Sequence, residues 1–540
     1  MSPLPGAPLR YTAVGVSDTV DSTEVFPGAM ASLKNLVPYP AGKNYWYCRP
    51  AMVQMTDFAT FNTPDFISCF IVVGDRAYGM IKSQRFAGFE EPFSYDLAGG
   101  TFTAIAGPTA LNTPSVTTSS GTWVPPTMAV VGTKIIVTHP GWSGVGANFF
   151  GVIDIANPGA PTWTSSNTAT NALPVVPTAV ANFNGRAMFL VNPPTGQPGA
   201  YLSDALVPTT ITNAGQILTF DDNVQLTALA PLPLASQLGG VVQSMIVFKG
   251  VTNLYQVTGD FTTNDLRKDA LNIATGTLSP NSITPTPLGL LFNSPEGLRI
   301  ISFNAVVSEP IGVEGSGIVV PLTKAKVPSR VCAAANGSVV RVTTQNDDKV
   351  GSPFEEYWYD IPRKIWSGPH TSAASLIKRW KNTFVVAPVA QLHSLAQSDV
   401  VQSAGTSFTE YGTTLTWEYT TAFLPDTQQM AEVSMVETTV NIAFDTTTPS
   451  ITAEFINADE QTTDIVVMSI SGASSIWGSF VWGVSPWGGA LTKLKPKQIP
   501  WTDPVVFRRG KLRLSGDSST GIILGDMYMR YQILEFLQEN

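Results

Sequence analysis

Charged residues are scarce in this sequence. Asp, Glu, Lys and Arg make up 13% of the 540 residues, against a share of roughly 25% in ordinary globular proteins. Interface cores are depleted in charge, so the scarcity favours a surface that faces other subunits. The net charge of −9 argues against a protein that grips nucleic acid, because such proteins need a basic surface.

Cysteine and histidine are also rare, with three of each. The cysteines are far apart and odd in number, so no disulfide framework or CxxC metal motif is visible. No histidine has a second His or Cys at metal-ligand spacing, and HExxH, GxSxG, Walker and GxGxxG motifs are absent. We therefore expect no enzymatic activity, no required metal and no cofactor.

Long hydrophobic runs are missing as well. No run approaches the roughly 18 apolar residues of a membrane span, and the first residues lack a charged start followed by an apolar segment. The sequence predicts folding in a reducing cytoplasm, without a membrane anchor.

A repeated hairpin pattern is present instead. An apolar run, a Gly or Asn turn and a second apolar run recur along the chain at broadly similar intervals. VVQSMIVFKGVTNLYQVTGD, which begins at Val241, is one copy. The seven turns fall at Gly74, Gly132, Gly185, Gly250, Gly297, Gly337 and Asn382.

A second landmark follows the first turn at an almost fixed distance. Asp96, Asp154 and Asp360 each follow the turn glycine of their own repeat, and the spacing is the same to within a single position. Two hairpins at a constant offset make a four-stranded sheet, and such sheets repeated along a chain build a β-propeller. We predict an all-β fold with a propeller of six to eight blades, in which these Asp side chains hydrogen-bond their own turns.

The C-terminal quarter has a different sequence pattern. After a polar stretch, strands with period-two alternation follow one another up to Leu512, Leu514, Met527 and Met529. We expect an N-terminal arm with first strands at 1–55, the propeller at 56–400 and a β-sandwich-like domain at 401–540. As an alternative, the last strand of the chain returns to close the propeller ring.

Two features of this quarter are candidates for partner docking. Trp477, Trp482 and Trp487 are each followed by glycine, and they either cap turns or form an aromatic docking patch. The basic residues of the second feature cover a solvated strand, dock onto an acidic partner subunit or contact DNA phosphates; those we single out are Lys493, Lys495, Lys497, Arg508 and Arg509.

Adjacent acidic residues are the remaining candidates for chemistry. Propeller glycosidases carry paired carboxylates, so each acidic pair needs weighing. Asp221–Asp222, which precede Asn223, lack the full oxygen set of a Ca²⁺ site. We interpret the pairs as solvated turns; they are Glu90–Glu91, Asp221–Asp222, Asp347–Asp348 and Glu355–Glu356.

Four stretches together resemble one protein family. They are SLKNLVPYP…YCRPAMVQMTDF, SMIVFKGVTNLYQVTGD, YWYDIPRKIWSGPHT and KLRLSGDSSTGIILGDMYMRYQ. In this order and spacing they resemble the tail hub or nozzle proteins of short-tailed bacteriophages, also called packaged-DNA stabilisation proteins. Ala51 stands where the family usually has a turn glycine.

The resemblance implies a structural virion protein of the tail, assembled in the host cytoplasm. It implies a homohexameric ring below the head–tail adaptor that retains the packaged genome and conducts DNA without sequence-specific binding. It also implies contacts to tail fibres or spikes and to a tail tip or plug protein. The alternatives are a receptor- or glycan-binding propeller and a propeller glycosidase.

Overall fold

The structure is a computed structural model, and every long regular element among the residues that it describes is a β-strand. Two short 3-10 helices, Pro280–Ser282 and Pro328–Arg330, are the other regular elements described. No helix in the described part is long and apolar enough to cross a membrane. The residues described are 9–16, 28–39, 45–49, 51–54, 66–82, 89–108, 111, 124–235, 241–262, 265–271, 273–311, 327–345, 354–371, 374–388, 401–403, 409–410, 413–422, 424, 431–444, 450–457, 461–469, 494–502, 505–517 and 522–536.

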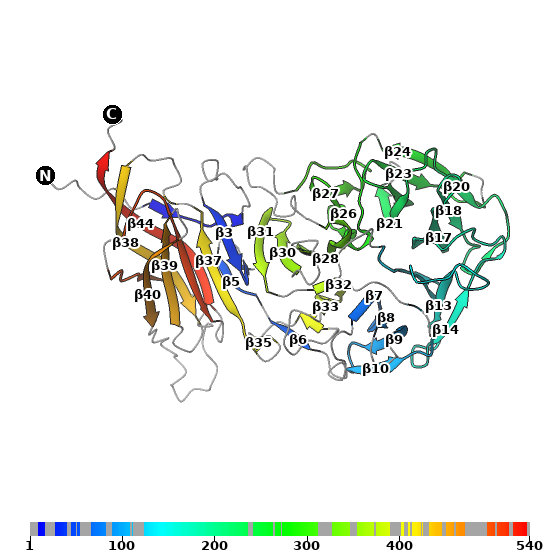
Figure 1. Ribbon diagram of the computed structural model, residues 1–540, viewed down its shortest axis with the longest axis horizontal. Coiled ribbons are helices and arrows are strands. Elements are labelled where there is room, and N and C mark those ends of the chain that lie inside the picture. The colour runs from blue at the N-terminus through cyan, green and yellow to red at the C-terminus, as the bar shows by residue number, and fades with distance from the viewer. Residues whose placement is uncertain are drawn as a thin grey trace.

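Seven antiparallel sheets, six with four strands and one with three, form a ring (Figure 1). The first three blades comprise β7 (Phe66–Val73), β8 (Arg76–Lys82), β9 (Glu90–Asp96) and β10 (Thr101–Ala104); β11 (Thr127–Val131), β12 (Lys134–Thr138), β13 (Phe150–Asp154) and β14 (Thr162–Ser166); and β16 (Ala179–Phe183), β17 (Arg186–Val191), β18 (Gly199–Leu202) and β20 (Ile217–Thr219). Two short strands, β15 (Ala169–Thr170) and β19 (Thr210–Ile211), pair beside the third blade.

The remaining blades continue the ring. They comprise β21 (Leu226–Ala235), β22 (Val241–Lys249), β23 (Asn253–Thr258) and β24 (Arg267–Leu271); β25 (Thr284–Thr286), β26 (Gly289–Ser294) and β27 (Gly297–Ser302); β28 (Cys332–Asn336), β29 (Val339–Gln345), β30 (Phe354–Asp360) and β31 (Ile365–His370); and β32 (Ala374–Trp380), β33 (Thr383–Pro388), β34 (Val401–Ser403) and β6 (Met52–Gln54). Except at the junction of the fourth and fifth blades, the first strands of neighbouring blades contact one another, and β32 contacts β7. At that junction β21 contacts the 3-10 helix Pro280–Ser282, which precedes β25. The predicted propeller is thus confirmed, with seven blades.

The constant offset between turn glycine and aspartate has a structural cause. In the first, second and sixth blades, the residue after the aspartate donates its N–H to a carbonyl of the first turn. These bonds, each 2.8 Å long, join Leu97 to Asp75, Ile155 to Thr133 and Ile361 to Ser338. The two hairpin turns of a blade therefore lie side by side on one face of the ring.

The aspartates hold their own turns, as predicted. The Asp96 carboxylate accepts hydrogen bonds from the N–H groups of Ala98 and Gly99, and Asp154 and Asp360 accept comparable bonds. The bond from the Gly99 N–H is the main reason that the pKa of Asp96 is lowered.

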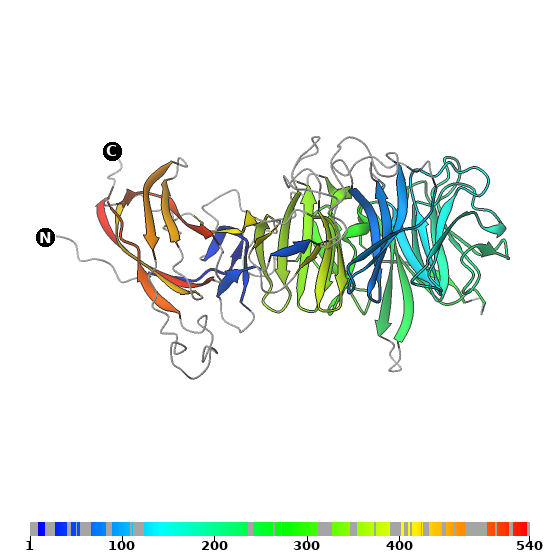
Figure 2. The ribbon, with the colours of Figure 1, turned by 90° about the horizontal axis from the view of Figure 1, so that it is seen from below.

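Two of the seven turns do not lie in the first hairpin of a blade, where the repeat pattern predicts them. Gly250 joins β22 to β23, and Gly297 follows the turn from β26 to β27, so both belong to the second and third strands of their blades. In the fourth blade the first hairpin instead joins β21 to β22. These two long strands project beyond the rim of the ring in the side view (Figure 2).

The ring is closed by a strand from near the N-terminus. In the seventh blade, β6 pairs antiparallel with β34, so a segment from one end of the propeller completes the blade at the other end. The alternative closure by the last strand of the chain is not what the structure has, because that strand pairs within the second domain.

The second domain is a β-sandwich of two sheets. One sheet contains β1 (Leu9–Tyr11), β4 (Leu36–Pro38), β5 (Trp46–Cys48), β38 (Ala431–Phe444), β41 (Lys495–Gln498), β42 (Val505–Phe507) and β44 (Ile522–Phe536). The other contains β2 (Gly15–Val16), β3 (Ala29–Lys34), β37 (Thr416–Thr421), β39 (Ser450–Asn457), β40 (Thr462–Ser469) and β43 (Gly510–Asp517). A two-stranded pair, β35 (Thr409–Glu410) and β36 (Thr413–Thr414), precedes β37.

The sandwich unites both ends of the chain. Figure 1 shows the N-terminal strands among the C-terminal ones, and the propeller is inserted between them. The region expected as an N-terminal arm at 1–55 is therefore divided: its strands up to β5 lie in the sandwich and β6 lies in the propeller. These boundaries differ from the expected ones because short strands pair across almost the whole chain length.

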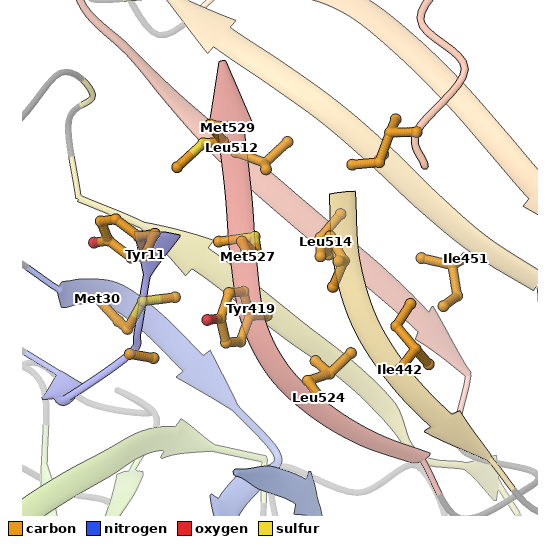
Figure 3. Close-up of a cluster of buried hydrophobic side chains, with 14 of the residues drawn as sticks. Tyr11, Met30, Tyr419, Ile442, Ile451, Leu512, Leu514, Leu524, Met527 and Met529 are labelled. Atoms are coloured by element: carbon orange, nitrogen blue, oxygen red, sulfur yellow. The ribbon is translucent and has the colours of Figure 1, made fainter. Parts of the chain in front are cut away.

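The core of the sandwich follows the predicted alternation. Leu512 and Leu514 of β43 and Met527 and Met529 of β44 are fully buried, and Figure 3 shows them with Tyr11, Met30 and Tyr419 between the sheets. Truncating such a side chain to Ala typically costs about 2–5 kcal/mol. Burial raises the pKa of the Tyr419 phenol well above its ordinary value.

Candidate functional site

One acidic residue of the propeller belongs to a buried polar cluster rather than to a solvated turn. The Glu90 side chain at the start of β9 is inaccessible to solvent, which corrects the expectation for this pair. Its Oε2 accepts a hydrogen bond of 2.7 Å from the Ser68 hydroxyl and lies 2.6 Å from Nε2 of His139. The cluster joins the first blade to the second.

The geometry of this cluster does not suit a serine nucleophile. The Gly141 N–H donates to Nδ1 of His139 over 2.9 Å, so the imidazole proton lies on Nε2 and points at Glu90. Ser68 donates to the same carboxylate oxygen, so the imidazole is not placed to accept the hydroxyl proton. The cluster satisfies its own buried groups and connects two blades.

A second acidic residue, Glu356, is buried in the same way. The Arg341 guanidinium donates two hydrogen bonds to its carboxylate, of 2.5 and 2.9 Å, and the Trp358 indole N–H donates a third. The guanidinium carbon also lies 4.9 Å from the ring centre of Trp358 and 5.2 Å from that of Phe384. This group ties the sixth blade to the seventh, and it too corrects the expectation of a solvated pair.

The acidic pair Asp221–Asp222 lies at the surface but is engaged by lysines. Oδ1 of Asp221 lies 3.1 Å from Nζ of Lys268, and Oδ1 of Asp222 lies 2.5 Å from Nζ of the buried Lys249. The bond from Lys249 is the main cause of the lowered pKa of Asp222. Lysine ammonium groups therefore lie against the carboxylates that a Ca²⁺ ion would need. The pair Asp347–Asp348 lies outside the described residues.

No metal-binding group emerges from the rest of the described chain either. Three or more His, Cys, Asp or Glu side chains do not come together there in an arrangement that could hold an ion. The three cysteines are buried, and desolvation raises the pKa of the Cys48 thiol to about 12.

A polar joint connects the propeller to the sandwich. Asn35, between β3 and β4, donates its backbone N–H to Nδ1 of His370 over 3.0 Å, and its amide bonds Thr371 and the carbonyl of Thr416. Nε of the fully buried Arg49 donates to the Asn35 side-chain oxygen over 2.9 Å. Four distant segments therefore meet at one asparagine.

The protonation state of this joint is fixed by its surroundings. Burial lowers the pKa of His370 well below its ordinary value, and the positive charges of Arg49 and Arg341 lower it further. Its Nδ1 accepts the Asn35 N–H, so the ring is neutral with its proton on Nε2, which lies 3.3 Å from the Ser367 hydroxyl. Sequence analysis missed this joint, because Asn35 and His370 lie far apart in the chain.

A cavity of about 380 Å³ lies beside the joint. Its walls come from both domains and include Tyr47 of the sandwich and Trp358 of the propeller. Its charged groups are already engaged. Nη2 of Arg363 bonds the carbonyl of Tyr39 across the domain boundary, and Nη1 bonds Asp360 within the propeller. This arrangement favours a structural joint over a ligand site.

The residues singled out for partner docking lie in different parts of the sandwich. Lys495 and Lys497 are on β41, at one end of the seven-stranded sheet. Arg508, which is exposed, and Arg509, which is half-buried, form the turn between β42 and β43. The three tryptophans and Lys493 lie outside the described residues; they are Trp477, Trp482, Trp487 and Lys493.

Comparison with known proteins gives similarities of fold only. No family model matches the chain, and no curated protein matches it. Similar solved structures include a puromycin hydrolase, with 10% identity and a TM-score of 0.37 over 68% of this chain and 62% of that chain. The WD40 repeats of RRP9 have 9% identity and a TM-score of 0.38 over 67% of this chain and 100% of that chain. The SapL1 lectin with alpha methyl fucoside has 12% identity and a TM-score of 0.30 over 58% of this chain and 97% of that chain.

These low values support no inference about activity. At such identities and TM-scores, neither peptide hydrolysis nor fucoside binding is carried over to this chain. The chain spans 62% of the puromycin hydrolase, and its own sheets establish the propeller.

Proposed function

We propose that the protein is a structural component of the tail of a short-tailed bacteriophage. In this role, copies of the chain form a ring-shaped hub or nozzle below the head–tail adaptor, which retains the packaged genome and conducts DNA during ejection. The four stretches that resemble tail hub proteins motivate the proposal. Fibres or spikes and a tip or plug protein would contact the outside of the ring.

The observation that carries the proposal is that the buried polar groups bond to one another and connect parts of the fold. Glu90 is buried and bonded between two blades, and His370 is buried and bonded between the two domains. Arg341 and Glu356 are buried and paired within the sixth blade, and the Arg341 guanidinium also contacts Phe384 of the seventh blade. In an enzyme such groups would be expected to face a cleft that admits substrate. Here these buried groups connect parts of the scaffold, as a rigid structural protein requires.

The charge balance supports a duct that does not hold DNA. The chain has 31 Lys and Arg against 40 Asp and Glu, so a continuous basic lining is hard to assemble. Each phosphate contact adds to a salt-dependent grip, and an acidic or neutral wall avoids that grip. We place the basic residues around Lys497 on the outside of the ring, against an acidic neighbour.

The mass of the purified protein in solution tests the proposal. The chain has a mass of 57.6 kDa, so mass photometry resolves an assembly of six copies from smaller forms. A closed ring of six copies, alone or as a joined pair of such rings, is the expected result. A stable monomer that binds a soluble glycan would contradict the tail role and favour a receptor-binding propeller.

A further inference from the structure

The six-stranded sheet of the sandwich ends in a strand with an apolar outer side. β40 pairs with β39 on one side, and no strand among the described residues pairs with its other side. Val466 and Met468 point into the core, while Ile465 is 54% and Val467 is 64% exposed. An edge strand presents unpaired N–H and C=O groups, which only another extended segment can satisfy along its length.

Natural edge strands are usually protected by Lys, Pro or bulges. β41, at the end of the other sheet, follows this rule with the sequence KPKQ, from Lys495 to Gln498. β40 reads TTDIVVMS and has neither lysine nor proline. Its one charge, Asp464, is already bonded by the N–H and hydroxyl of Thr502.

The apolar surface is confined to this edge. On the neighbouring strands the same face of the sheet carries Thr452 and Glu454 of β39 and Arg513 of β43, which stand in register with Val467 and Ile465. Glu454 and Arg513 form an ion pair of 2.5 Å. A solvated face would continue this polar pattern to its last strand, so the change at β40 points to a covered edge.

We infer that β40 pairs with β40 of a second copy of this chain, antiparallel and about a twofold axis. A register centred on Val466 places Ile465 of each copy opposite Val467 of the other. The same register places Asp464 opposite Met468, so the two carboxylates do not face each other. A contact about a twofold axis must be self-complementary. β40 meets this requirement, because apolar side chains lie opposite apolar side chains and like charges do not lie opposite each other.

The inference stands independently of the proposed tail role. A chain with no other contact between copies would form a dimer through β40. A chain that also closes into a six-membered ring would form two rings joined back to back, because a twofold contact is added to a cyclic one.

The test compares lysine substitutions at two exposed valines. Val467→Lys places an ammonium group on the edge, whereas Val436→Lys, at a residue 46% exposed on the interior strand β38, is the matched control. Sedimentation velocity should show that Val467→Lys halves the mass of the wild-type assembly and that Val436→Lys leaves it unchanged. Circular dichroism of each variant checks that the fold is kept.

Hydrogen exchange at the β40 amides separates the sources of coverage. Pairing between copies predicts protection that rises with protein concentration and is lost in Val467→Lys. Protection that is independent of concentration would mean that the same chain covers the edge, and the inference would then be wrong. Single six-membered rings that Val467→Lys leaves unchanged would contradict the β40 pairing and agree with the tail role. A dimer that Val467→Lys dissociates would support the β40 pairing and contradict the tail role.

Discussion

Replacement of Arg341 by Ala should destabilise the propeller strongly. The side chains of Arg341 and Glu356 are inaccessible to solvent and joined by two hydrogen bonds. Removal of the guanidinium leaves a buried carboxylate whose remaining donor among the bonds described above is the Trp358 N–H. Breaking a buried pair in this way typically costs about 3–5 kcal/mol. Contacts to the rings of Trp358 and Phe384 are lost as well.

Urea unfolding followed by tryptophan fluorescence measures this loss. The control is Arg267→Ala, whose side chain is 74% exposed and 3.7 Å from Asp269, and which should cost less than about 0.5 kcal/mol. The double variant Arg341→Met/Glu356→Leu removes both charges and keeps most of the volume, so it should lose less than Arg341→Ala alone. A loss below about 1 kcal/mol for Arg341→Ala, or a larger loss for the double variant, would refute the reasoning.

Three further outcomes are expected. Burial lowers the pKa of His370 in the folded protein, so below about pH 6.5 the unfolded chain binds a proton that the folded chain does not. The free energy of unfolding should therefore fall as the pH drops below that value, by up to about 1.4 kcal/mol per pH unit. In His370→Asn the fall should be less steep. Asp526 accepts bonds from Arg10 and Thr12, so Asp526→Ala should release the N-terminal strand β1, seen as faster proteolysis near Leu9 with the propeller transition unchanged. Duplex DNA should bind weakly in filter assays at low and physiological salt; tight binding abolished by substituting Lys493, Lys495 and Lys497 would place these residues in the channel and contradict the non-stick wall.

The propeller could be predicted because its repeat is encoded locally. The spacing from Gly74 to Asp96 recurs in the second and sixth blades because in these three blades the two hairpin turns are hydrogen-bonded to each other. The fourth blade escaped this pattern because Pro231 and Pro233 lie within its first strand. Proline is depleted in strands, so the sequence there does not resemble the start of a blade.

The division of the N-terminal region could not be predicted from local pattern. β1 is a very short strand whose partner, β44, comes from the opposite end of the chain, and so short a strand carries no periodic signal. The buried acids were missed for a similar reason. Glu90 sits beside a second glutamate in the sequence, while its partner His139 comes from another blade. Glu356, by contrast, lies diagonally opposite Arg341 in the hairpin between β29 and β30, because Arg341 stands opposite Trp358 in the register. Diagonal neighbours on one face of a hairpin are within reach of long side chains, so this contact could be inferred from the hairpin.

Electron cryomicroscopy of the purified protein tests the central proposal most directly. A tail hub predicts closed rings of six copies around a central channel, singly or as joined pairs, with the basic strand β41 on the outer surface. A population of separate monomers at every concentration, or a ring whose channel is lined by β41, would contradict it.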